Sequence, residues 1–268
     1  VPDVGGSITA GAYVLNSLSL ARTGVGQDLA FADTRDVLNL TSGAFFVSAG
    51  TYAANIGSAP GNGAITAGGT LSTGTAWLYL AQSGSSTTLN SSIIDNPAGA
   101  GVRMVWSPTG AGSLVLAGTN TYSKGTVLNG GATFTGSLTV APGGNLPAGD
   151  VTVNFVTLNW SAGGLIDPSN TVTLNGGAIF NTPPGLATLT GLNFNNNGGP
   201  SVAVNIGGTL ALTGSVSASS TNSASVAVLG PAGGLLDLNG NNRVFAVAPV
   251  RFFNNVDVAN ATPTLQVT

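Results

Sequence analysis

The sequence predicts an all-β protein that forms one parallel β-solenoid with coils of about 22 residues. Three observations support this fold class. Helix-forming residues are scarce, short alternating strand patterns recur along the chain, and one turn motif repeats at a regular spacing. We expect a single elongated domain over residues 1–268, with less regular coils over 1–111 and clearer repeats over 112–268.

The composition argues against helices. Only 6% of the 268 residues are charged, against about 25% in an ordinary soluble domain. Glu is absent, Lys occurs once, and the 41 Gly and 13 Pro residues interrupt almost every stretch long enough to form a helix. Ser, Thr and Asn are therefore expected to keep the surface hydrated.

Strand patterns are frequent and short. Apolar and polar residues alternate over 14–20, 113–116, 171–175 and 202–206. This period of two places apolar side chains on one face of a strand and polar side chains on the other. Each segment is therefore expected to be a half-buried strand.

An Asn-Gly-Gly motif gives the repeat length. The segment Leu128–Phe134 recurs as Leu174–Phe180, a shift of 46 residues, and a third Asn-Gly-Gly begins at Asn197, 22 residues after Asn175. A period near 22 fits both shifts if the first spans two coils. Coils stacked about 4.8 Å apart predict roughly a dozen turns and a rod on the order of 60 Å long.

The repeated motif is expected to form the corners between faces of the solenoid. Gly adopts positive φ freely, and Asn tolerates it best among the other residues. Asn side chains at matching positions in successive coils are also expected to form a ladder of amide hydrogen bonds. The motif residues are Asn129, Gly130, Gly131, Asn175, Gly176, Gly177, Asn197, Gly198 and Gly199.

The stretch GSLVLAGTNTYSKGTVLNGGATF, residues 112–134, resembles the autotransporter-associated β-strand repeat, G-x-L-x-L-x-G-x-N-T-Y-x-G-G-T-x-V-x-G-G-T-L. Asn120, Tyr122 and Gly125 occupy matching positions, whereas Lys124 replaces the first glycine of the Gly-Gly pair. The resemblance implies a right-handed parallel β-helix on the outside of a didermic, planctomycete-like bacterium. It implies a scaffold without catalytic activity.

Several kinds of site are not expected. The chain has no Cys and no His, so no imidazole base, Cys nucleophile, disulfide or usual zinc site is available. We predict no catalytic, metal-binding or cofactor-binding residues. The closest charged group, Asp28, Asp33, Arg35 and Asp36, is compatible with a calcium or catalytic cluster, but we interpret it as a solvated polar edge of the first coils.

Charge and hydropathy limit the partners. The net charge is −3 and the six cations are scattered, so nucleic acid is not an expected partner. No apolar run is long enough for a transmembrane helix. The segment beginning at Val1 lacks a signal-peptide pattern, and we interpret the sequence as a mature or excised form.

Three functions are compatible with these features. The first is a non-enzymatic structural protein, extracellular or on the outer cell surface, that assembles end to end into a fibre or matrix through strand-edge stacking. The second is an adhesin that binds glycans, and the third is a polysaccharide lyase or hydrolase. The candidate sugar-stacking residues, which we expect to be buried under loops, are Trp77, Tyr79, Trp106, Tyr122 and Trp160.

Overall fold

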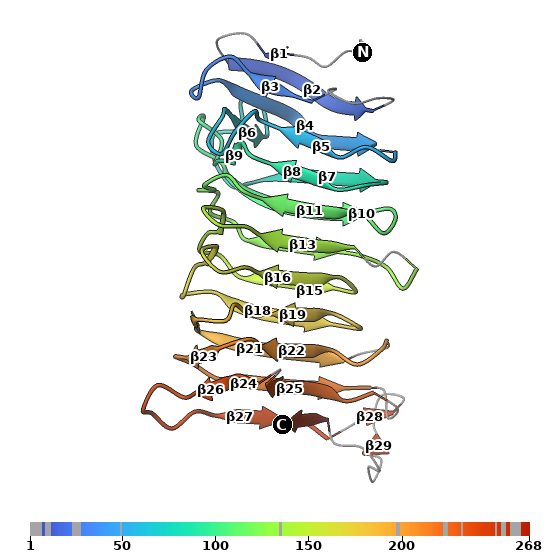
Figure 1. The fold of residues 1–268 in the computed structure, drawn as a ribbon, viewed down its shortest axis with the longest axis vertical. Coiled ribbons are helices and arrows are strands. Elements are labelled where there is room, and N and C mark those ends of the chain that lie inside the picture. The colour runs from blue at the N-terminus through green and yellow to red at the C-terminus, as the bar shows by residue number, and fades with distance from the viewer. Residues whose placement is uncertain are drawn as a thin grey trace.

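The chain forms a right-handed parallel β-helix of about 9 turns (Figure 1). The computed structural model describes residues 7–8, 12–22, 28–48, 50–133, 136–196, 199–221, 225–231, 233–249, 251–252, 256–257 and 264–268. These residues contain no helix, and thus none that is long and apolar enough to cross a membrane. The predicted fold class is confirmed.

One long parallel sheet runs along the whole solenoid. Its strands follow each other in the order β27 (Phe245–Val247), β24 (Val216–Ser220), β21 (Gly191–Asn196), β18 (Thr171–Asn175), β15 (Val151–Asn154), β12 (Thr126–Asn129), β10 (Gly101–Pro108), β7 (Thr75–Ser83), β4 (Val37–Ser48), β6 (Ala64–Ala67) and β9 (Ser92–Ile93), and β2 (Ala12–Ala21) also pairs with β4.

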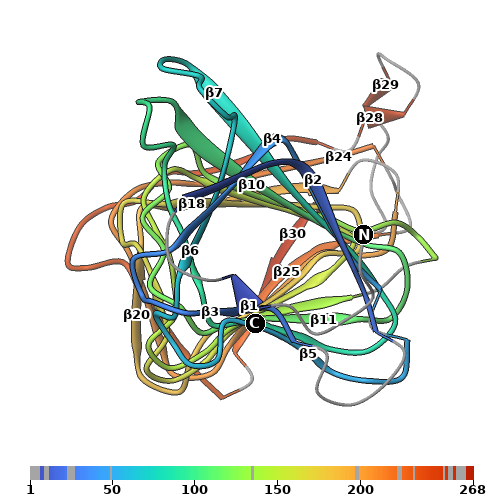
Figure 2. The ribbon, with the colours of Figure 1, turned by 90° about the horizontal axis from the view of Figure 1, so that it is seen from above.

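A nine-stranded parallel sheet forms the opposite side (Figure 2). Its strands are β30 (Leu265–Val267), β25 (Ala227–Pro231), β22 (Ala203–Ile206), β19 (Ile179–Asn181), β16 (Thr157–Trp160), β13 (Ser137–Val140), β11 (Ser113–Leu116), β8 (Thr87–Leu89) and β5 (Ala54–Ile56).

Shorter strands form the third side and the two ends. The third side holds the pair β14 (Asn145–Leu146) and β17 (Leu165–Ile166), followed by β20 (Leu186–Leu189), β23 (Thr209–Leu212) and β26 (Leu235–Asp237). Near the ends, β1 (Ser7–Ile8) pairs with β3 (Ala30–Phe31), and β28 (Arg251–Phe252) pairs antiparallel with β29 (Val256–Asp257).

Coil length varies along the solenoid. In the long sheet, Val151 pairs with Val172, Val172 with Leu192, and Leu192 with Val216, which gives offsets of 21, 20 and 24 residues. Nearer the N-terminus, Ala54 pairs with Thr87, an offset of 33. The period near 22 therefore holds in the central coils, and longer outer coils explain why there are about nine turns rather than a dozen.

The N-terminal part of the long sheet contains a branch. The first part of β4, from Val37 to Leu40, pairs with β6, whereas its second part, from Ala44 to Ser48, pairs with β7. Gly43 lies between the two parts with φ +72°, and a Cβ at this position would collide with the carbonyl oxygen of Trp77. Figure 2 shows β7 projecting from the body of the solenoid beyond this branch.

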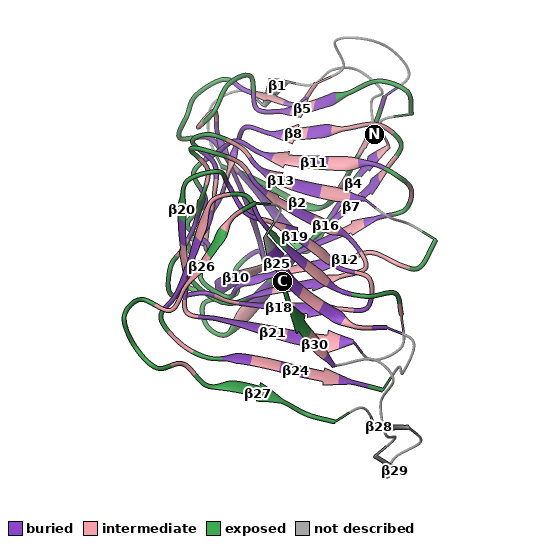
Figure 3. Ribbon diagram, turned by 60° about the horizontal axis from the view of Figure 1, so that its bottom comes forward, coloured by how far each residue is buried: buried purple, intermediate pink, exposed green. Residues whose placement is uncertain are grey.

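The core is a column of apolar side chains stacked in register. In the nine-stranded sheet, successive coils contribute buried residues that pair directly, in the order Leu114, Leu138, Leu158, Phe180, Val204 and Leu229. Buried residues recur in coil after coil along the solenoid (Figure 3). Each such side chain stabilises the fold by about 1.5–3 kcal/mol, so neighbouring coils hold one another together.

We predict that Gly125→Ala destabilises the fold much more than Gly74→Ala. Both glycines have nearly equal φ, +82° and +80°, so the penalty for placing Ala in the left-handed region, about 1–2 kcal/mol, is common to both. A Cβ at Gly125 would also collide with the carbonyl oxygen of Gly149, whereas a Cβ at Gly74 meets nothing within 4 Å.

The expected extra loss for Gly125→Ala is about 2 kcal/mol. Urea unfolding followed by circular dichroism measures it. Equal losses in the two variants would contradict the packing role of Gly125.

Candidate functional site

Asn120 joins three coils inside the solenoid. Its side chain is buried, and its Oδ1 accepts a hydrogen bond from the backbone N of Ile93 at 2.8 Å. Its Nδ2 donates to the carbonyl oxygen of Asn145 at 2.7 Å, and Asn145 Nδ2 donates back to the carbonyl oxygen of Asn120 at 2.9 Å. The two side-chain amides take the place of backbone hydrogen-bond partners at this turn, so their role is structural.

Tyr122 is also a core residue. Its side chain is buried and its hydroxyl forms a hydrogen bond of 2.5 Å with Thr126 Oγ1. Burial raises the pKa of the Tyr122 phenol above its ordinary value of 10.0, and the hydrogen bond to Thr126 offsets only part of the rise. The phenol is therefore a buried, neutral group.

Asparagine ladders connect successive coils on both large sheets. Asn154 Nδ2 donates to Asn129 Oδ1 at 3.4 Å, and Asn175 Nδ2 donates to Asn154 Oδ1 at 2.5 Å. On the nine-stranded sheet, Asn181 Nδ2 donates to Asn159 Oδ1 at 2.7 Å, and Asn205 Nδ2 donates to Asn181 Oδ1 at 2.8 Å. The predicted ladder of amide hydrogen bonds is thus present on both large sheets.

The asparagine and the glycines of the Asn-Gly-Gly motif have different structural roles. Asn129 and Asn175 end strands β12 and β18 and supply ladder amides, so they are not the corner residues that the sequence suggested. Gly176 and Gly177 follow Asn175 with φ +20° and +70°.

The remaining motif glycines are placed as follows. Gly130 donates its backbone N–H to the carbonyl oxygen of Asn154 at 2.9 Å, and Gly131 follows it at the end of this coil. Gly199 lies against the next corner, where a Cβ would be 3.0 Å from the Cα of Gly176. Asn197 and Gly198 lie outside the described residues.

The Phe155 ring explains the glycines at positions 176 and 199. Phe155 occupies the equivalent corner one coil earlier, with φ +56°. A Cβ at Gly176 would lie 2.8 Å from Cζ of this ring, and a Cβ at Gly199 would lie 3.1 Å from its Cε1. Side chains at these positions would displace the ring.

The described carboxylates accept hydrogen bonds at turns. Asp28 accepts from the backbone N of Asn55 at 2.8 Å and lies 3.4 Å from Arg22 Nη1. Asp33 and Asp36 bond backbone groups of their own turn. Asp95, Asp150, Asp167 and Asp237 likewise accept from backbone N–H groups, and the bonds from Ser169 lower the pKa of Asp167.

The Asp28–Asp36 segment thus contains strand β3 followed by a turn, and Asp36 is buried, so the expectation of a solvated edge is wrong for Asp36. Within the described part of the chain, no three acidic, His or Cys side chains converge on a possible metal site.

The candidate aromatic residues separate into two groups. Trp106, Tyr122 and Trp160 are buried, as expected. Trp77 and Tyr79 are 42% and 46% exposed, so the expectation of burial is wrong for these two. The reason is strand parity: Ala76, Leu78 and Leu80 alternate with them and point into the core, which leaves both rings on the outer face of β7.

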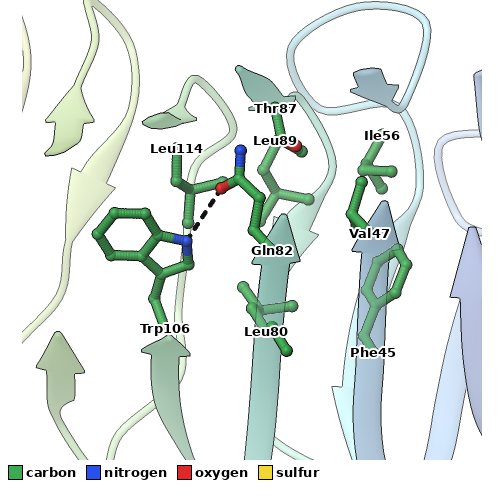
Figure 4. A pocket seen from close by; sticks show the side chains of 10 residues that line it. Phe45, Val47, Ile56, Leu80, Gln82, Thr87, Leu89, Trp106 and Leu114 are labelled. Carbon is green, nitrogen blue, oxygen red and sulfur yellow. Dashed lines mark hydrogen bonds between the residues drawn. The ribbon is translucent and has the colours of Figure 1, made fainter. Parts of the chain in front are cut away.

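The interior next to Trp106 is too small for a ligand. Figure 4 shows Trp106 and Gln82 among the apolar residues that line it, and Trp106 Nε1 donates to Gln82 Oε1 at 3.1 Å. The cavity measures about 20 Å³, room for about one water molecule. The aromatic surface outside the solenoid is therefore the better candidate for binding.

Trp77 and Tyr79 form a pair with nearly parallel rings on this outer face. Their ring centroids are 6.1 Å apart and their planes differ by 10°. The guanidinium carbon of Arg103, which pairs with Trp77 from the neighbouring strand β10, lies 5.2 Å from the Trp77 ring centroid. This cation–π contact holds Arg103 and Trp77 in a fixed relation.

A hollow of about 280 Å³ adjoins the pair. The register explains it, because small Ala44 pairs with Tyr79, and small Ala81 pairs with Phe46. The two rings, Tyr79 and the exposed Phe46, thus stand at diagonal positions with small residues between them. Ser17 and Ser19 of β2 complete the outer rim.

Two cations lie beside the aromatic pair. Lys124 extends across Gly101, where a Cβ would be 2.5 Å from its Cε, and Arg103 Nε donates to the carbonyl oxygen of Lys124. Among the described residues, neither cation is within ion-pairing distance of a carboxylate. Trp77, Tyr79, Arg103 and Lys124 together are called the aromatic-cationic surface.

Comparison with known proteins adds no identification: the sequence matches no protein-family model, no curated protein and no solved structure.

The motif did not reveal the aromatic-cationic surface, but the alternation in Trp77-Leu78-Tyr79-Leu80 was a signal for it. Leucines at every second position require the aromatic rings to face outward. The positions of Arg103 and Lys124 had no such signal, because they depend on offsets of 26 and 22 residues between β7, β10 and β12.

We predict that Asn181→Ala lowers the free energy of unfolding by about 1 kcal/mol, because it removes two amide hydrogen bonds from a half-buried ladder. Asn241→Ala is the control, since Asn241 is exposed and bonds only within its own turn, to Asn239. Its expected effect is below about 0.5 kcal/mol. Urea unfolding of both variants measures the difference, and equal effects would count against the ladder.

We predict that the stability advantage of the wild type over Tyr122→Phe shrinks as the pH rises above 10. The unfolded chain releases the Tyr122 proton near the ordinary pKa of 10.0, whereas the folded chain retains it. The advantage, about 1 kcal/mol at pH 8 from the bond to Thr126, then falls by up to about 1.4 kcal/mol per pH unit. Urea unfolding of both proteins at pH 8, 9.5 and 11 tests this; parallel pH curves would exclude it.

Proposed function

We propose that this chain is a non-enzymatic structural protein of the outer cell surface or extracellular matrix, and that it associates with further copies of itself. One observation carries the proposal: the polar side chains are used to hold the coils together. Asparagines form ladders between coils, and the described carboxylates bond backbone groups at turns. Carboxylates engaged in this way are poorly placed to act as an acid and a base.

The resemblance of residues 112–134 to autotransporter-associated repeats supports the same function. Asn120, Tyr122 and Gly125 of that stretch have structural roles in the core and at a turn. A repeat whose characteristic residues serve packing is suited to a scaffold. Extracellular placement rests on this resemblance.

Self-association is supported by the outermost strand at the N-terminal end. Among the described strands, β2 pairs with β4 alone, so it lies at the edge of the long sheet. Val14 and Leu15 on β2 are 61% and 40% exposed. A strand from another copy would satisfy such an edge by β-augmentation, and the low charge of the chain offers little repulsion.

We predict that the purified chain forms filaments as its concentration rises, with a subunit repeat on the order of 45 Å for nine coils at about 4.8 Å each. Negative-stain electron microscopy and light scattering on the same samples measure this.

Leu15→Lys is expected to abolish association, because it places a charge on the β2 edge. Leu186→Lys is the matched control: Leu186 is also exposed, at 70%, but lies on the third side of the solenoid. Monomeric wild-type rods at every concentration would overturn the self-association.

A second candidate function is glycan binding, and a specific observation favours it. Trp77 and Tyr79 expose nearly parallel rings beside a hollow of about 280 Å³. Contiguous exposed apolar side chains mark an interaction site more often than single ones do, and the C–H faces of sugar rings stack on aromatic rings. A scaffold and a glycan-binding surface are compatible in one molecule.

A further inference from the structure

We propose that the aromatic-cationic surface binds an acidic polysaccharide, with its sugar rings on Trp77 and Tyr79 and its carboxylates at Arg103 and Lys124. This inference rests on the second candidate function, glycan binding, and specifies the chemical class of the glycan. Uronic acid polymers have the required chemistry, because each sugar unit carries an apolar ring face and a carboxylate.

Two exposed aromatic rings stand next to each other along one strand. Trp77 and Tyr79 are two residues apart on one strand, so their rings follow each other along β7. The two ring centroids are 6.1 Å apart. A polysaccharide running along β7 would therefore present successive sugars to successive rings.

The cations form a second row, parallel to the aromatic row. Gly101 pairs with Thr75, and Arg103 pairs with Trp77, so the β10 row lies one strand spacing, about 4.8 Å, from the β7 row. Lys124 lies over Gly101, so it extends the row beyond Arg103 on the side of Thr75, away from Tyr79. A glycan stacked on the rings would have its carboxylates on this side.

The charge of this region favours an anion. Arg103 and Lys124 are two of only six cations in a chain of net charge −3. Asp95, which belongs to the same turn region, already accepts hydrogen bonds from the backbone N of Val102 and of Ser123. The cations thus exceed the carboxylates here, and charge-assisted hydrogen bonds to a ligand carboxylate are stronger than neutral ones.

The hollow extends the surface on the other side of the aromatic row. Tyr79 forms one wall and Phe46 another, and the hydroxyl-bearing residues Ser17 and Ser19 lie at the rim. A sugar ring or a branch seated here would contact apolar walls and reach polar groups at the edge. This combination suits a glycan better than a wholly apolar ligand.

Aromatic rings beside cations also occur on surfaces that bind single-stranded nucleic acids. Two cations beside two rings would neutralise few phosphates, so the charge favours the glycan. Single-stranded DNA is nevertheless included as a probe in the test.

The experiment is isothermal titration calorimetry with uronate tetrasaccharides of galacto, gluco and manno configuration. Their methyl esters, which keep the sugar backbone and lose the charge, are titrated in parallel. We expect at least one uronate to bind at least about tenfold more tightly than its ester. Raising the salt from 50 to 300 mM should weaken the binding of the uronate and leave the binding of the ester unchanged.

Four variants assign the contacts. Trp77→Ala and Tyr79→Ala should each lower the affinity for uronate and ester alike by about tenfold. Arg103→Gln and Lys124→Gln should each lower the affinity for the uronate by about tenfold and the affinity for the ester by less than about twofold. Arg103→Lys, which keeps the charge, should retain most of the binding.

Two further variants are matched controls on other parts of the surface. Tyr52→Ala removes another exposed aromatic ring, and Arg35→Gln removes another exposed cation. Neither should change the affinity for uronate or ester. Thermal unfolding of every variant confirms that the fold is retained.

Each negative result of these titrations has a different interpretation. Equal binding of uronates and esters would overturn the acidic specificity and leave glycan binding in place. Binding of neither would overturn both. Binding of single-stranded oligo-dT, but of no sugar, would replace the glycan by a nucleic acid.

Discussion

The in-register stacking of parallel strands is the constraint on which the whole structure depends. Each residue pairs with its counterpart one coil away, so a side chain of one kind meets another of the same kind about 4.8 Å further on. Leu114 pairs with Leu138 and then Leu158 in the core, while Asn154 pairs with Asn175 outside it. The hydrophobic column and the amide ladders are two results of one geometry.

The same register determines where the exposed aromatic and cationic side chains are placed. A residue on one strand is a fixed neighbour of residues on the adjacent coils, although they are 20 or more positions away in the sequence. Trp77 and Arg103 meet because Arg103 is the register partner of Trp77. The Gly43 bulge lets β4 pass from β6 to β7, and this change of partner brings Ala44 and Phe46 beside Tyr79 and Ala81. The proposed binding surface is thus formed from strands whose own sequences serve the core.

The fold was predictable because its signals are local and repeated. Alternating strands such as Thr171–Asn175 and the recurring Asn-Gly-Gly gave the solenoid and the length of its central coils. The number of coils was not predictable, since the offset of 33 between Ala54 and Thr87 has no counterpart in the motif. The exposure of Trp77 follows from strand parity alone, whereas its contact with Arg103 requires a register between distant strands that the sequence does not encode locally.

The direct pairing of the central coils also bears on how such a chain changes over generations. A coil between β15 and β18 contacts the coil before it and the coil after it, and both present the same kinds of side chain. Duplication of one coil would therefore lengthen the molecule by about 4.8 Å without creating a new kind of interface. Loss of a single residue inside a strand would instead turn every later side chain of that strand to the opposite face. Length is thus a trait that can vary in whole coils while the cross-section stays fixed.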